Sequence, residues 1–361
     1  MFQRLCRHLA GLLLIGLAAA AGADPACRIA YDIGSSGIRA GTTLSEATAR
    51  ANIDYLEPLW AGRGLEETVA PTVKALRDFP ESNALPADCP RVGGGFSAWR
   101  LALEKDAEQT AAILARLRAE SGVAVFVVPQ LREGAYGYLG SQKQLGERLN
   151  STHVLDIGGG SMQVAGEKTA YGAMLGQKAW LRLLCQEIRN AESTPCNLQP
   201  LTGDELETAR KLIQEQLAGI ATELPVGRMS LTAVSRPVTL GVYPAIEKLY
   251  PNEAAQRSIP LPTLSQSIDH LARLTMGETV AQTGAPHAPA AYLLSTMLLV
   301  EGIMQATATP SLAVAEVDLT NIPGLLADDR AFAWERRYGC YLDRLKDEGL
   351  TAFYSDPATC P

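Results

Sequence analysis

The chain contains the segment Ile29-Ala-Tyr-Asp32-Ile-Gly34-Ser35-Ser36-Gly37-Ile-Arg39-Ala-Gly41, and a near-copy follows at His153-Val-Leu-Asp156-Ile-Gly158-Gly159-Gly160-Ser161-Met-Gln163-Val-Ala-Gly166. In each copy, apolar residues flank a short turn of Gly and Ser, which is the pattern of a β-hairpin. Asp32 and Asp156 occupy the same place in the two copies, 124 residues apart. A repeat of this kind indicates two similar halves that face each other.

Other elements are predicted from periodicity and from breaking residues, and strands alternate with helices as in an α/β chain. Glu66 to Phe79 predicts a helix that Pro80 ends. Residues 101–120 place Ala, Leu and Ile at helical spacing and predict one continuous helix. The pattern Thr263-x-x-Gln266 predicts a helix start, and Asp328 to Glu348 predicts a single terminal helix.

Length and composition indicate a globular chain of two domains. It has 361 residues, of which 47% are hydrophobic and 20% charged, so it can bury a core and is too apolar to be disordered. At about 150 residues per domain, we expect a first domain at 24–143 and a second at 144–361. No low-complexity linker marks the boundary, and the terminal helix could pack back on the first domain.

The first 23 residues are interpreted as a secretory signal peptide. Arg4 and Arg7 form a positive start, 13 apolar residues follow, and Ala21-Gly22-Ala23 is a small-residue cleavage site. The apolar stretch is shorter than the roughly 20 residues that span a bilayer. The sequence therefore predicts a periplasmic or secreted protein with no membrane span after cleavage; an uncleaved anchor is the alternative.

Cysteine usage agrees with an oxidising compartment. Six cysteines remain after the signal peptide, at positions 27, 89, 185, 196, 340 and 360. An even number in an exported chain indicates disulfides, and six cysteines allow 15 pairings. One such pairing is Cys185–Cys196, which closes a short loop, with Cys340–Cys360, which ties down the C-terminus, and Cys27–Cys89. Buried free thiols are the alternative.

The charge balance argues against some partners and sites. Lys and Arg number 32 against 39 Asp and Glu, a net charge of −7, and no run of basic residues occurs. Duplex nucleic acid, which is bound through clustered cations, is therefore not expected as a partner. Four histidines are present and no two stand at ligand spacing, which argues against a His-rich zinc site.

The two Gly/Ser turns predict a site for phosphate and a divalent cation. Glycine lets backbone N–H groups approach phosphate oxygens, and serine adds hydroxyl donors. Mg²⁺ binds through few carboxylates and keeps water ligands, so Asp32 and Asp156 are predicted to hold Mg²⁺ or another divalent cation. Arg39 adds a positive charge. The predicted phosphate-binding residues of the turns are Gly34, Ser35, Ser36, Gly158, Gly159, Gly160 and Ser161. Two ordinary structural turns are the alternative.

Glu133 is the candidate general base. It lies in Leu131-Arg132-Glu133-Gly134, at the start of a predicted helix that follows a buried strand at 123–128. A carboxylate at that place commonly faces the cleft of an α/β fold, where it could deprotonate a water that attacks phosphorus. The alternative is a glutamate that only interacts with the helix dipole.

These segments resemble the two phosphate motifs of the actin-like ATPase superfamily. Within it, the chain resembles the Ppx/GppA family of exopolyphosphatases and guanosine-pentaphosphate phosphatases, which has Asp-Leu-Gly-Ser, a Glu-Glu-Ala-Arg segment before Tyr-Leu-Gly, and Asp-Ile-Gly-Gly-Gly-Ser in this order. The resemblance places Glu133 on the catalytic glutamate, Arg100 near a phosphate-binding arginine and Asp156 on a metal-linked aspartate. It covers residues 27–166 well and the rest in outline.

A second resemblance is to the apyrases, which are secreted nucleoside triphosphate diphosphohydrolases. Gln163, which we add to the predicted phosphate-binding residues together with Arg100, stands where apyrases have Gln, and Gly134 also fits their pattern. Both families have another Gly-rich loop in the second half. Here the candidate, Leu231-Thr-Ala-Val-Ser235-Arg236-Pro237, has no Gly. Either Arg236 replaces the backbone donors or this loop binds no phosphate.

The resemblance implies an α/β fold of two ribonuclease-H-like, actin-type domains with a cleft between them. It also implies an exported exopolyphosphatase-type enzyme that releases phosphate from polyphosphate or a related polyanion by Mg²⁺-dependent attack of water. An apyrase-like hydrolase of nucleotides is one alternative, and a non-catalytic sensor of a phosphate ligand is an alternative of another class. The expected partners are polyphosphate or a nucleotide, and no oligomeric state is predicted.

Overall fold

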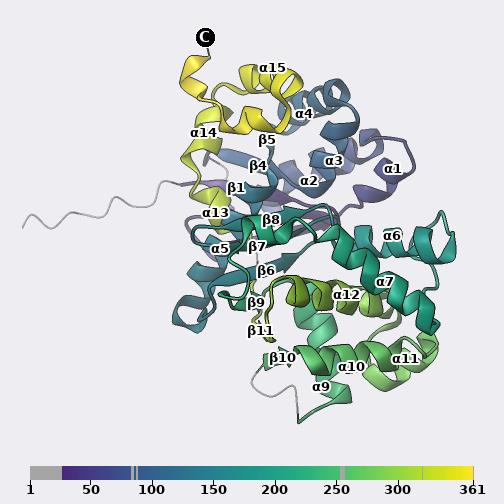
Figure 1. The fold of residues 1–361 in the computed structure, drawn as a ribbon. Coiled ribbons are helices and arrows are strands. Elements are labelled where there is room, and N and C mark those ends of the chain that lie inside the picture. The colour runs from purple at the N-terminus through teal and green to yellow at the C-terminus, as the bar shows by residue number, and fades with distance from the viewer. Residues whose placement is uncertain (1–26, 83–84, 87, 253–256, 319, 361) are drawn as a thin grey trace, which may run out of the picture.

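The protein has two lobes, each built on its own sheet (Figure 1). The computed structural model describes residues 27–82, 85–86, 88–252, 257–318 and 320–360, and the predicted signal peptide at 1–23 lies outside them. In spatial order, the first sheet contains β3 Thr48–Asn52, β2 Gly37–Thr42, β1 Ile29–Ile33, β4 Arg91–Gly95 and β5 Ala124–Val127. The second contains β10 Ser258–Pro260, β11 Ser311–Val314, β9 Leu231–Ala233, β6 His153–Ile157, β7 Met162–Gly166 and β8 Ala170–Ala173.

Helices pack around both sheets (Figure 1). Those before β6 are α1 Leu56–Trp60, α2 Glu66–Ser82, α3 Ser97–Lys105, α4 Ala107–Ser121 and α5 Gln130–Leu145. Those of the middle segment are α6 Gln177–Arg189, α7 Gly203–Gln216, α8 Ile220–Glu223, α9 Tyr243–Leu249, α10 Leu261–Leu271, α11 Met276–Thr283 and α12 His287–Ala306. The last are α13 Ile322–Leu326, α14 Asp329–Glu335 and α15 Tyr338–Glu348. Shorter helical turns lie at Gly146–Arg148, Pro237–Val242, Gly349–Tyr354 and Pro357–Thr359.

Both predicted hairpins are present and occupy the same place in the two sheets. β1 pairs antiparallel with β2 and parallel with β4, while β6 pairs antiparallel with β7 and parallel with β9. Asp32 stands opposite Arg39, and Asp156 stands opposite Gln163. The sequence repeat therefore corresponds to a structural repeat, with each aspartate on an inner strand just before its turn.

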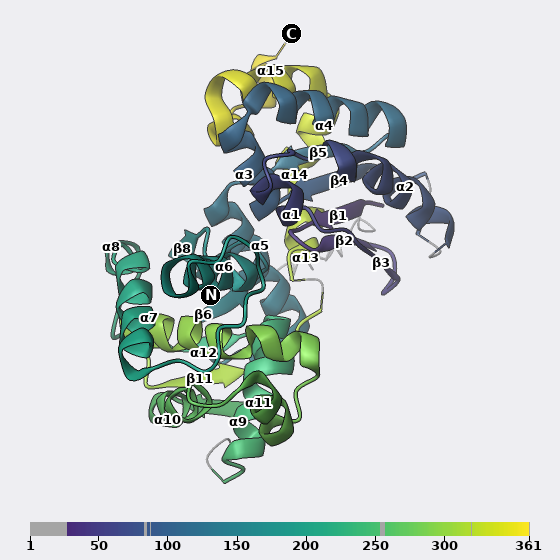
Figure 2. The ribbon, with the colours of Figure 1, turned by 90° about the vertical axis from the view of Figure 1, so that its right-hand side faces the viewer.

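The C-terminal helices return to the first lobe, where α15 lies beside α4 (Figure 2). Phe126 of β5 packs edge-on against Tyr338 and Tyr341 of α15, with ring centroids 5.5 and 4.9 Å apart. The same tyrosines pair backbone groups of β5, which is one of the two edge strands of its sheet. Val127 N donates to Tyr341 Oη over 2.9 Å, and Tyr338 Oη donates to Val125 O over 2.8 Å. The end of the chain is thus part of the first lobe's core.

Helix α5 follows the first sheet in the sequence but packs on β6, β7 and β8 of the second sheet, and on α13. Arg132 and Tyr136 of α5 both donate to Asp328, the N-cap of α14, with Arg132 Nη2 at 2.8 Å. The chain therefore crosses between the lobes twice, before α5 and before α13, and the two crossings are tied to each other.

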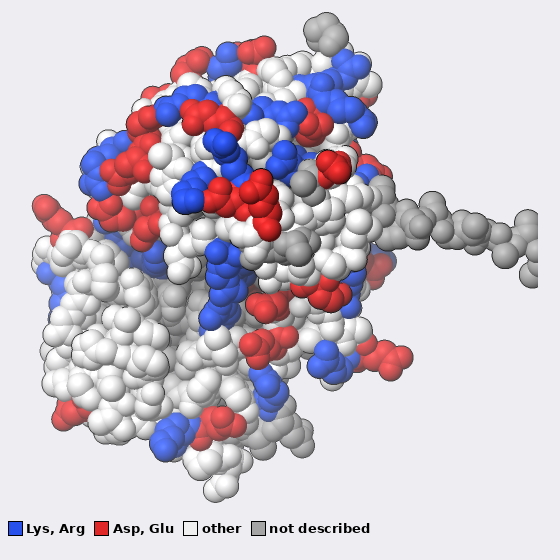
Figure 3. Space-filling model, turned by 180° about the vertical axis from the view of Figure 1, so that it is seen from behind, with Lys and Arg blue, Asp and Glu red and all other residues white. Residues whose placement is uncertain are grey.

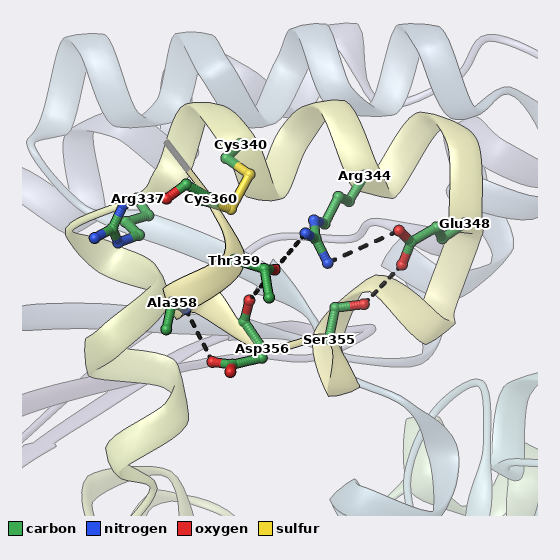
Figure 4. Close-up of a disulfide and its surroundings, with 9 residues drawn as sticks. All are labelled: Arg337, Cys340, Arg344, Glu348, Ser355, Asp356, Ala358, Thr359 and Cys360. Atoms are coloured by element: carbon green, nitrogen blue, oxygen red, sulfur yellow. Dashed lines mark hydrogen bonds and ion pairs between the residues drawn. A yellow bond between two sulfur atoms is a disulfide. The ribbon is translucent and has the colours of Figure 1, made fainter.

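Three disulfides join Cys27 to Cys89, Cys185 to Cys196 and Cys340 to Cys360. This is the pairing suggested among the 15 that the sequence allows. The last of them fastens the C-terminal segment under α15 (Figure 4). There Arg344 Nη2 donates to Thr359 Oγ1 over 2.6 Å, and Ser355 Oγ donates to Glu348 Oε2 over 2.7 Å.

The prediction that Pro80 ends a helix is wrong, because α2 continues to Ser82. Proline lacks the N–H that would bond to the carbonyl of Leu76, one turn earlier. Tyr31 Oη donates to this carbonyl instead, over 3.3 Å. The proline therefore leaves no unpaired carbonyl at this point of the last turn, and the helix tolerates it.

Two predicted single helices are each a pair of helices. Residues 97–121 form α3 and α4, because Asp106 adopts an extended conformation and accepts from Gln109 N over 2.9 Å as the N-cap of α4. The capping aspartate favours a new helix start, a local effect that overrides the helical spacing of apolar residues. Residues 329–348 form α14 and α15, because Arg337, between them, leaves the helical conformation with φ −126° and ψ 35°.

The predicted helix start at Thr263 is also wrong. Thr263 lies inside α10, which begins at Leu261 directly after Pro260. Capping boxes form instead at Thr202 and Glu205 before α7 and at Thr275 and Glu278 before α11, where each residue's side chain binds the other's backbone N–H.

Among the described residues, one helix, α12, is long and apolar enough to cross a membrane by length and composition, with a mean hydropathy of 1.2. Of that stretch, 72% is buried inside the protein. Glu301, near its end, is 1% exposed and pairs with Arg210 Nε over 2.9 Å. Helix α12 packs here as a core helix of the second lobe.

Candidate active site

Residues of both lobes line a cleft of about 310 Å³. Most predicted site residues face it: Asp32, Gly34, Ser35, Ser36, Arg39, Glu133, Asp156, Gly158, Gly159, Ser161 and Gln163. Gly160 and Arg100 do not line the cleft, and both are buried. The two turns, both aspartates and the candidate base are therefore brought to one place from separate parts of the sequence.

The two Gly/Ser turns meet at close range. A methyl group on Gly159 would lie 3.0 Å from Ser35 Cβ. A methyl group on Gly160 would lie 2.9 Å from Ser35 Oγ and 3.0 Å from Ser97 Oγ. The second turn thus has glycine where a side chain would collide with the first lobe. Gly160 faces this contact, which is why it does not line the cleft.

The second turn presents backbone N–H groups that are free to bind an anion. Its carbonyls at Gly158 and Gly159 accept from the first two N–H groups of α6, each over 2.8 Å. Since N–H and C=O point in opposite directions in a trans peptide, the N–H groups of Gly159 and Gly160 point away from α6. Within the described residues, neither N–H donates to a protein acceptor. Successive free amides of this kind form an anion-binding turn.

Asp32 and Asp156 form a pair of carboxylates in the cleft. Burial raises the pKa of Asp156 to about 6; the positive charge of Arg39 opposes this rise, and the negative charge of Asp32 adds to it. Burial also raises the pKa of Asp32. Two neighbouring carboxylates whose charges repel each other are stabilised in their ionised forms by a bound cation.

Asn321, just before α13, adds a neutral oxygen to this pair. Its Nδ2 donates to Asp32 Oδ2 over 3.4 Å, and its Oδ1 is buried without a hydrogen-bond partner among the described residues. A methyl group on Gly137 would lie 3.7 Å from this oxygen and 3.9 Å from Asp156 Oδ2. One amide therefore lies near both aspartates.

These groups fit a hard divalent cation. The described parts of the chain contain no group of three or more His, Cys, Asp or Glu side chains that could hold a metal ion. Asp32 and Asp156 instead offer two carboxylates, and the unpaired oxygen of Asn321 offers a third donor. An all-oxygen set with few protein ligands suits Mg²⁺, which keeps several of its waters.

Glu133, in the first turn of α5, is a buried carboxylate that lines the cleft. Its Oε2 is enclosed by protein and forms an ion pair with Arg100 Nη2 over 2.7 Å. Burial raises the pKa of Glu133 to about 7; Arg100 opposes this rise, and the charges of Asp156 and Asp32 add to it. A carboxylate that lines the cleft and has a pKa near neutrality suits a general base.

Arg100 is held by protein groups behind the cleft wall. Its Nη1 donates to Val128 O over 2.9 Å, and its Nη2 donates to Ser161 Oγ over 3.0 Å. Ser161 Oγ also accepts from Gln163 Nε2 over 3.1 Å. Because Oγ already accepts twice, the hydroxyl proton of Ser161 remains available to donate to a ligand. In this geometry Arg100 fixes Glu133 and Ser161, while Gln163 lines the cleft itself.

Further polar residues line the cleft that the sequence pattern did not predict, among them Arg50, Lys178, Thr320 and Asn321. Arg50 joins the site because it stands directly opposite Arg39 in the β2–β3 pairing. Asn321 joins it through a contact with Asp32, 289 residues away, which no local pattern encodes. The Gly-free loop after β9 also lines the cleft, through Ser235, Arg236 and Pro237.

The sequence profile of the Ppx/GppA phosphatase family matches residues 102–320, more than half of the chain. The protein belongs to the Ppx/GppA phosphatase family. The match includes Glu133 and the second turn, while the first hairpin and Arg100 lie before it. No curated protein sequence matches the chain.

Solved structures of the Ppx/GppA family share the fold. The Aquifex aeolicus family member has a TM-score of 0.63 at 16% identity, over 83% of this chain and 96% of that chain. An exopolyphosphatase from Cytophaga hutchinsonii has a TM-score of 0.60 at 18% identity, over 83% of this chain and 96% of that chain. The likeness confirms the predicted fold of two ribonuclease-H-like, actin-type domains.

As a Ppx/GppA phosphatase, the protein is a hydrolase of acid anhydrides, and the predicted family and enzyme class are confirmed. The cleft holds the groups that this chemistry needs: free amides for phosphate, paired carboxylates for a cation and a carboxylate that can accept a proton.

Proposed function

We propose that the protein is an exported exopolyphosphatase-type enzyme that releases orthophosphate from polyphosphate or a related phosphate polyanion by Mg²⁺-dependent attack of water. One observation carries this proposal: the Glu133 carboxylate shares a cleft with both Gly/Ser turns and both aspartates. The signal-peptide pattern and the three disulfides support a place in the periplasm or outside the cell.

The two turns would hold the phosphate that is removed. The free N–H groups of Gly159 and Gly160 and the hydroxyl proton of Ser161 are donors to its oxygens. Arg39, which lines the cleft opposite Asp32, supplies a positive charge. Donors fixed before the substrate arrives are effective because they need no rearrangement during the reaction.

Glu133, which lines the cleft, would orient the attacking water and take its proton on the carboxylate. The water oxygen then forms a bond to the terminal phosphorus, and the P–O bond to the bridging oxygen breaks. The products are orthophosphate and a phosphate chain shorter by one unit. Arg100 acts as a positioning residue, because it holds both Glu133 and Ser161 from behind.

Asp32 and Asp156, with the Asn321 amide oxygen, would hold the cation. A bound Mg²⁺ neutralises phosphate oxygens and stabilises the charge of the transition state. The chain's own contribution is to set the two carboxylates close together before the cation arrives.

Hydrolysis of a nucleotide is the second candidate, favoured by Gln163, which lines the cleft as the apyrase resemblance implies. The other residue of that resemblance, Gly134, has a packing reason, because a methyl group there would lie 3.2 Å from Ala165 Cβ. Gly134 therefore carries no information about the substrate.

The test is a phosphate-release panel on the mature protein, with long-chain polyphosphate, pyrophosphate, ATP and ADP, each with and without Mg²⁺. We expect Mg²⁺-dependent release, fastest from polyphosphate. Faster release from ATP or ADP would establish the nucleotide alternative. Binding of these ligands without any release would contradict an enzyme of this kind and establish a sensor.

A further inference from the structure

Three arginines from three different elements line the same cleft. Arg39 on β2 and Arg50 on β3 stand directly opposite each other, so their side chains share one face of the sheet with Cβ atoms roughly 4.5–5.5 Å apart. Arg236 follows β9 in the second lobe. Burial and the positive charges of Arg39 and Arg236 lower the pKa of Arg50, so the three charges lie close together.

The two lobes differ in the residues that stand beside their aspartates on the neighbouring strands. In the first sheet, the row that begins with the aspartate continues across the strands with Arg39 and Arg50. In the second sheet, the matching row continues with Gln163 and Gly172. The structural repeat therefore keeps both aspartates but adds positive charge on one side alone.

Arg39 has the nearby charges of Asp32 and Asp156, whereas Arg50 and Arg236 have few counter-charges. Like charges directly opposite each other destabilise a sheet. The carboxylate beside Arg50 is Asp318, at 3.8 Å and with a side chain that is 78% exposed, and such a surface contact contributes little. Within the described ranges, the side chains of Arg39 and Arg236 form no ion pair or hydrogen bond with protein groups. The positive charges of Arg50 and Arg236 are therefore poorly compensated by protein carboxylates and can attract an anion.

Ser235, next to Arg236, adds an unpaired donor. It lines the cleft and is 6% exposed, and its Oγ has no hydrogen-bond partner among the described residues. A buried hydroxyl without a partner costs free energy, which a ligand in the cleft would recover. Figure 3 shows positively charged side chains gathered at the hollow between the two lobes, beside largely uncharged surface of the second lobe.

We propose that Arg50, Arg236 and Ser235 form a second anion subsite, which binds a phosphate group remote from the bond that is cleaved. The inference rests on the proposed function and narrows its substrate to a linear phosphate chain. Neighbouring strands are about 4.8 Å apart, so the chain would run from the turns past Arg39 to Arg50. The loop after β9, which lacks glycine, would thus bind phosphate through the side chain of Arg236.

This subsite discriminates between the two candidate substrates. A polyphosphate continues with charged groups into the subsite, whereas a nucleotide would place an uncharged nucleoside there. The protein as a whole is acidic, with a net charge of −7. A polyanion is therefore attracted by this local cluster of arginines and not by the net charge of the protein. Screening limits the opposing long-range repulsion to about 8 Å at physiological salt.

The test measures ligand binding in a Glu133→Gln background, where hydrolysis is suppressed. The variants are Arg50→Gln and Arg236→Gln, alone and combined. We expect the combined variant to lose about tenfold or more in affinity for long-chain polyphosphate, the loss expected for charge-assisted hydrogen bonds. Affinities for pyrophosphate and ATP should change by less than about threefold. Arg228→Gln is the matched control, because Arg228 is an exposed arginine of the same lobe that does not line the cleft.

Two results would overturn the subsite: unchanged polyphosphate affinity, or an equal loss for all three ligands, which would place the arginines on the reacting phosphate. Because the readout is binding, absence of phosphate release by the unmodified protein refutes the proposed function and leaves this test valid. Thermal melting guards against misfolding. Without ligand, Arg50→Gln should melt no lower than the parent, since it removes a repulsion, while the stabilisation by polyphosphate should shrink.

Discussion

Arg100 Nη2 lies 2.7 Å from Glu133 Oε2, and the two side chains are only 5% and 10% exposed. The same guanidinium nitrogen holds Ser161 of the second lobe over 3.0 Å. One buried cation from the first lobe thus fixes both the candidate base and a donor of the candidate phosphate site. A buried pair of this kind is expensive to desolvate, so its presence at the cleft points to a role in catalysis.

Replacing Arg100 by Met should destabilise the protein in a pH-dependent way. At pH 8 the buried Glu133 charge loses its partner, at a cost of about 3–5 kcal/mol. At pH 5 Glu133 is protonated in the variant, so the cost should be much smaller. Denaturant unfolding at the two pH values measures the difference. Equal losses at both would show that Arg100 does not stabilise the Glu133 charge.

Glu133→Gln should lower turnover by roughly 10²–10⁴-fold while substrate binding is kept, because the amide accepts no proton. Phosphate release and equilibrium binding, measured side by side, separate the two effects. Glu147→Gln, an exposed glutamate just after α5, is the matched control and should behave as the parent. Unchanged turnover in Glu133→Gln would remove Glu133 from the mechanism.

The stability of Glu133→Gln should differ from the parent in a defined pH window. The folded-state pKa of Glu133 is about 7 against a usual 4.5, so the folded protein binds the proton more tightly than the unfolded chain. The resulting contribution to the free energy of unfolding is complete below pH 4.5 and is lost as the pH rises to about 7. The variant should lack this loss. Between pH 4 and pH 8, its free energy of unfolding should therefore decline less than that of the parent, which denaturant unfolding at several pH values would measure. Parallel curves would contradict the raised pKa.

The pH dependence of kcat/KM should show an acid limb that Glu133 causes. Below its pKa, activity should fall about tenfold per pH unit, because only the carboxylate accepts a proton from water. The midpoint should lie at or below about 7, since a cation on Asp32 and Asp156 removes the two charges that raise the pKa. A rate profile between pH 5 and pH 9 measures it, and a flat profile would exclude this base.

Mg²⁺ should stabilise the folded protein through Asp156 and Asn321. At a concentration of 100 times Kd, binding to the folded state adds about 2.7 kcal/mol, which is visible as a rise in Tm without any substrate. Asp156→Asn should abolish most of this rise, and Asn321→Ala should reduce it. Asn150→Ala, an exposed asparagine, serves as the control. A full Mg²⁺ response in Asn321→Ala would show that the Asn321 oxygen is not a ligand.

The parts of the fold that local chemistry determines were predictable from sequence. The two hairpins were identified because Gly and Ser turns between β-branched segments admit few other structures, and their repetition showed that there are two lobes. Glu133 was identified for a similar reason, since a carboxylate that follows a buried strand at a helix start faces the cleft in many α/β folds.

What depends on distant contacts was not predictable. Pro80 is tolerated because Tyr31, on a strand far away in sequence, pairs the carbonyl that the proline leaves free. Asn321 enters the site because the chain crosses back between the lobes just before α13. Arg100 was expected to face the phosphate, and its burial behind Glu133 follows from α3 packing, which no local pattern encodes.

The pairing of β5 with Tyr338 and Tyr341 sets the order in which the molecule can be completed. Until these last residues are made, the outer strand of the first sheet keeps an open row of N–H and C=O groups, a template for pairing with another copy. A fragment that stops at residue 143 would therefore be prone to self-association. The lobe that is synthesised first is the one that finishes folding last.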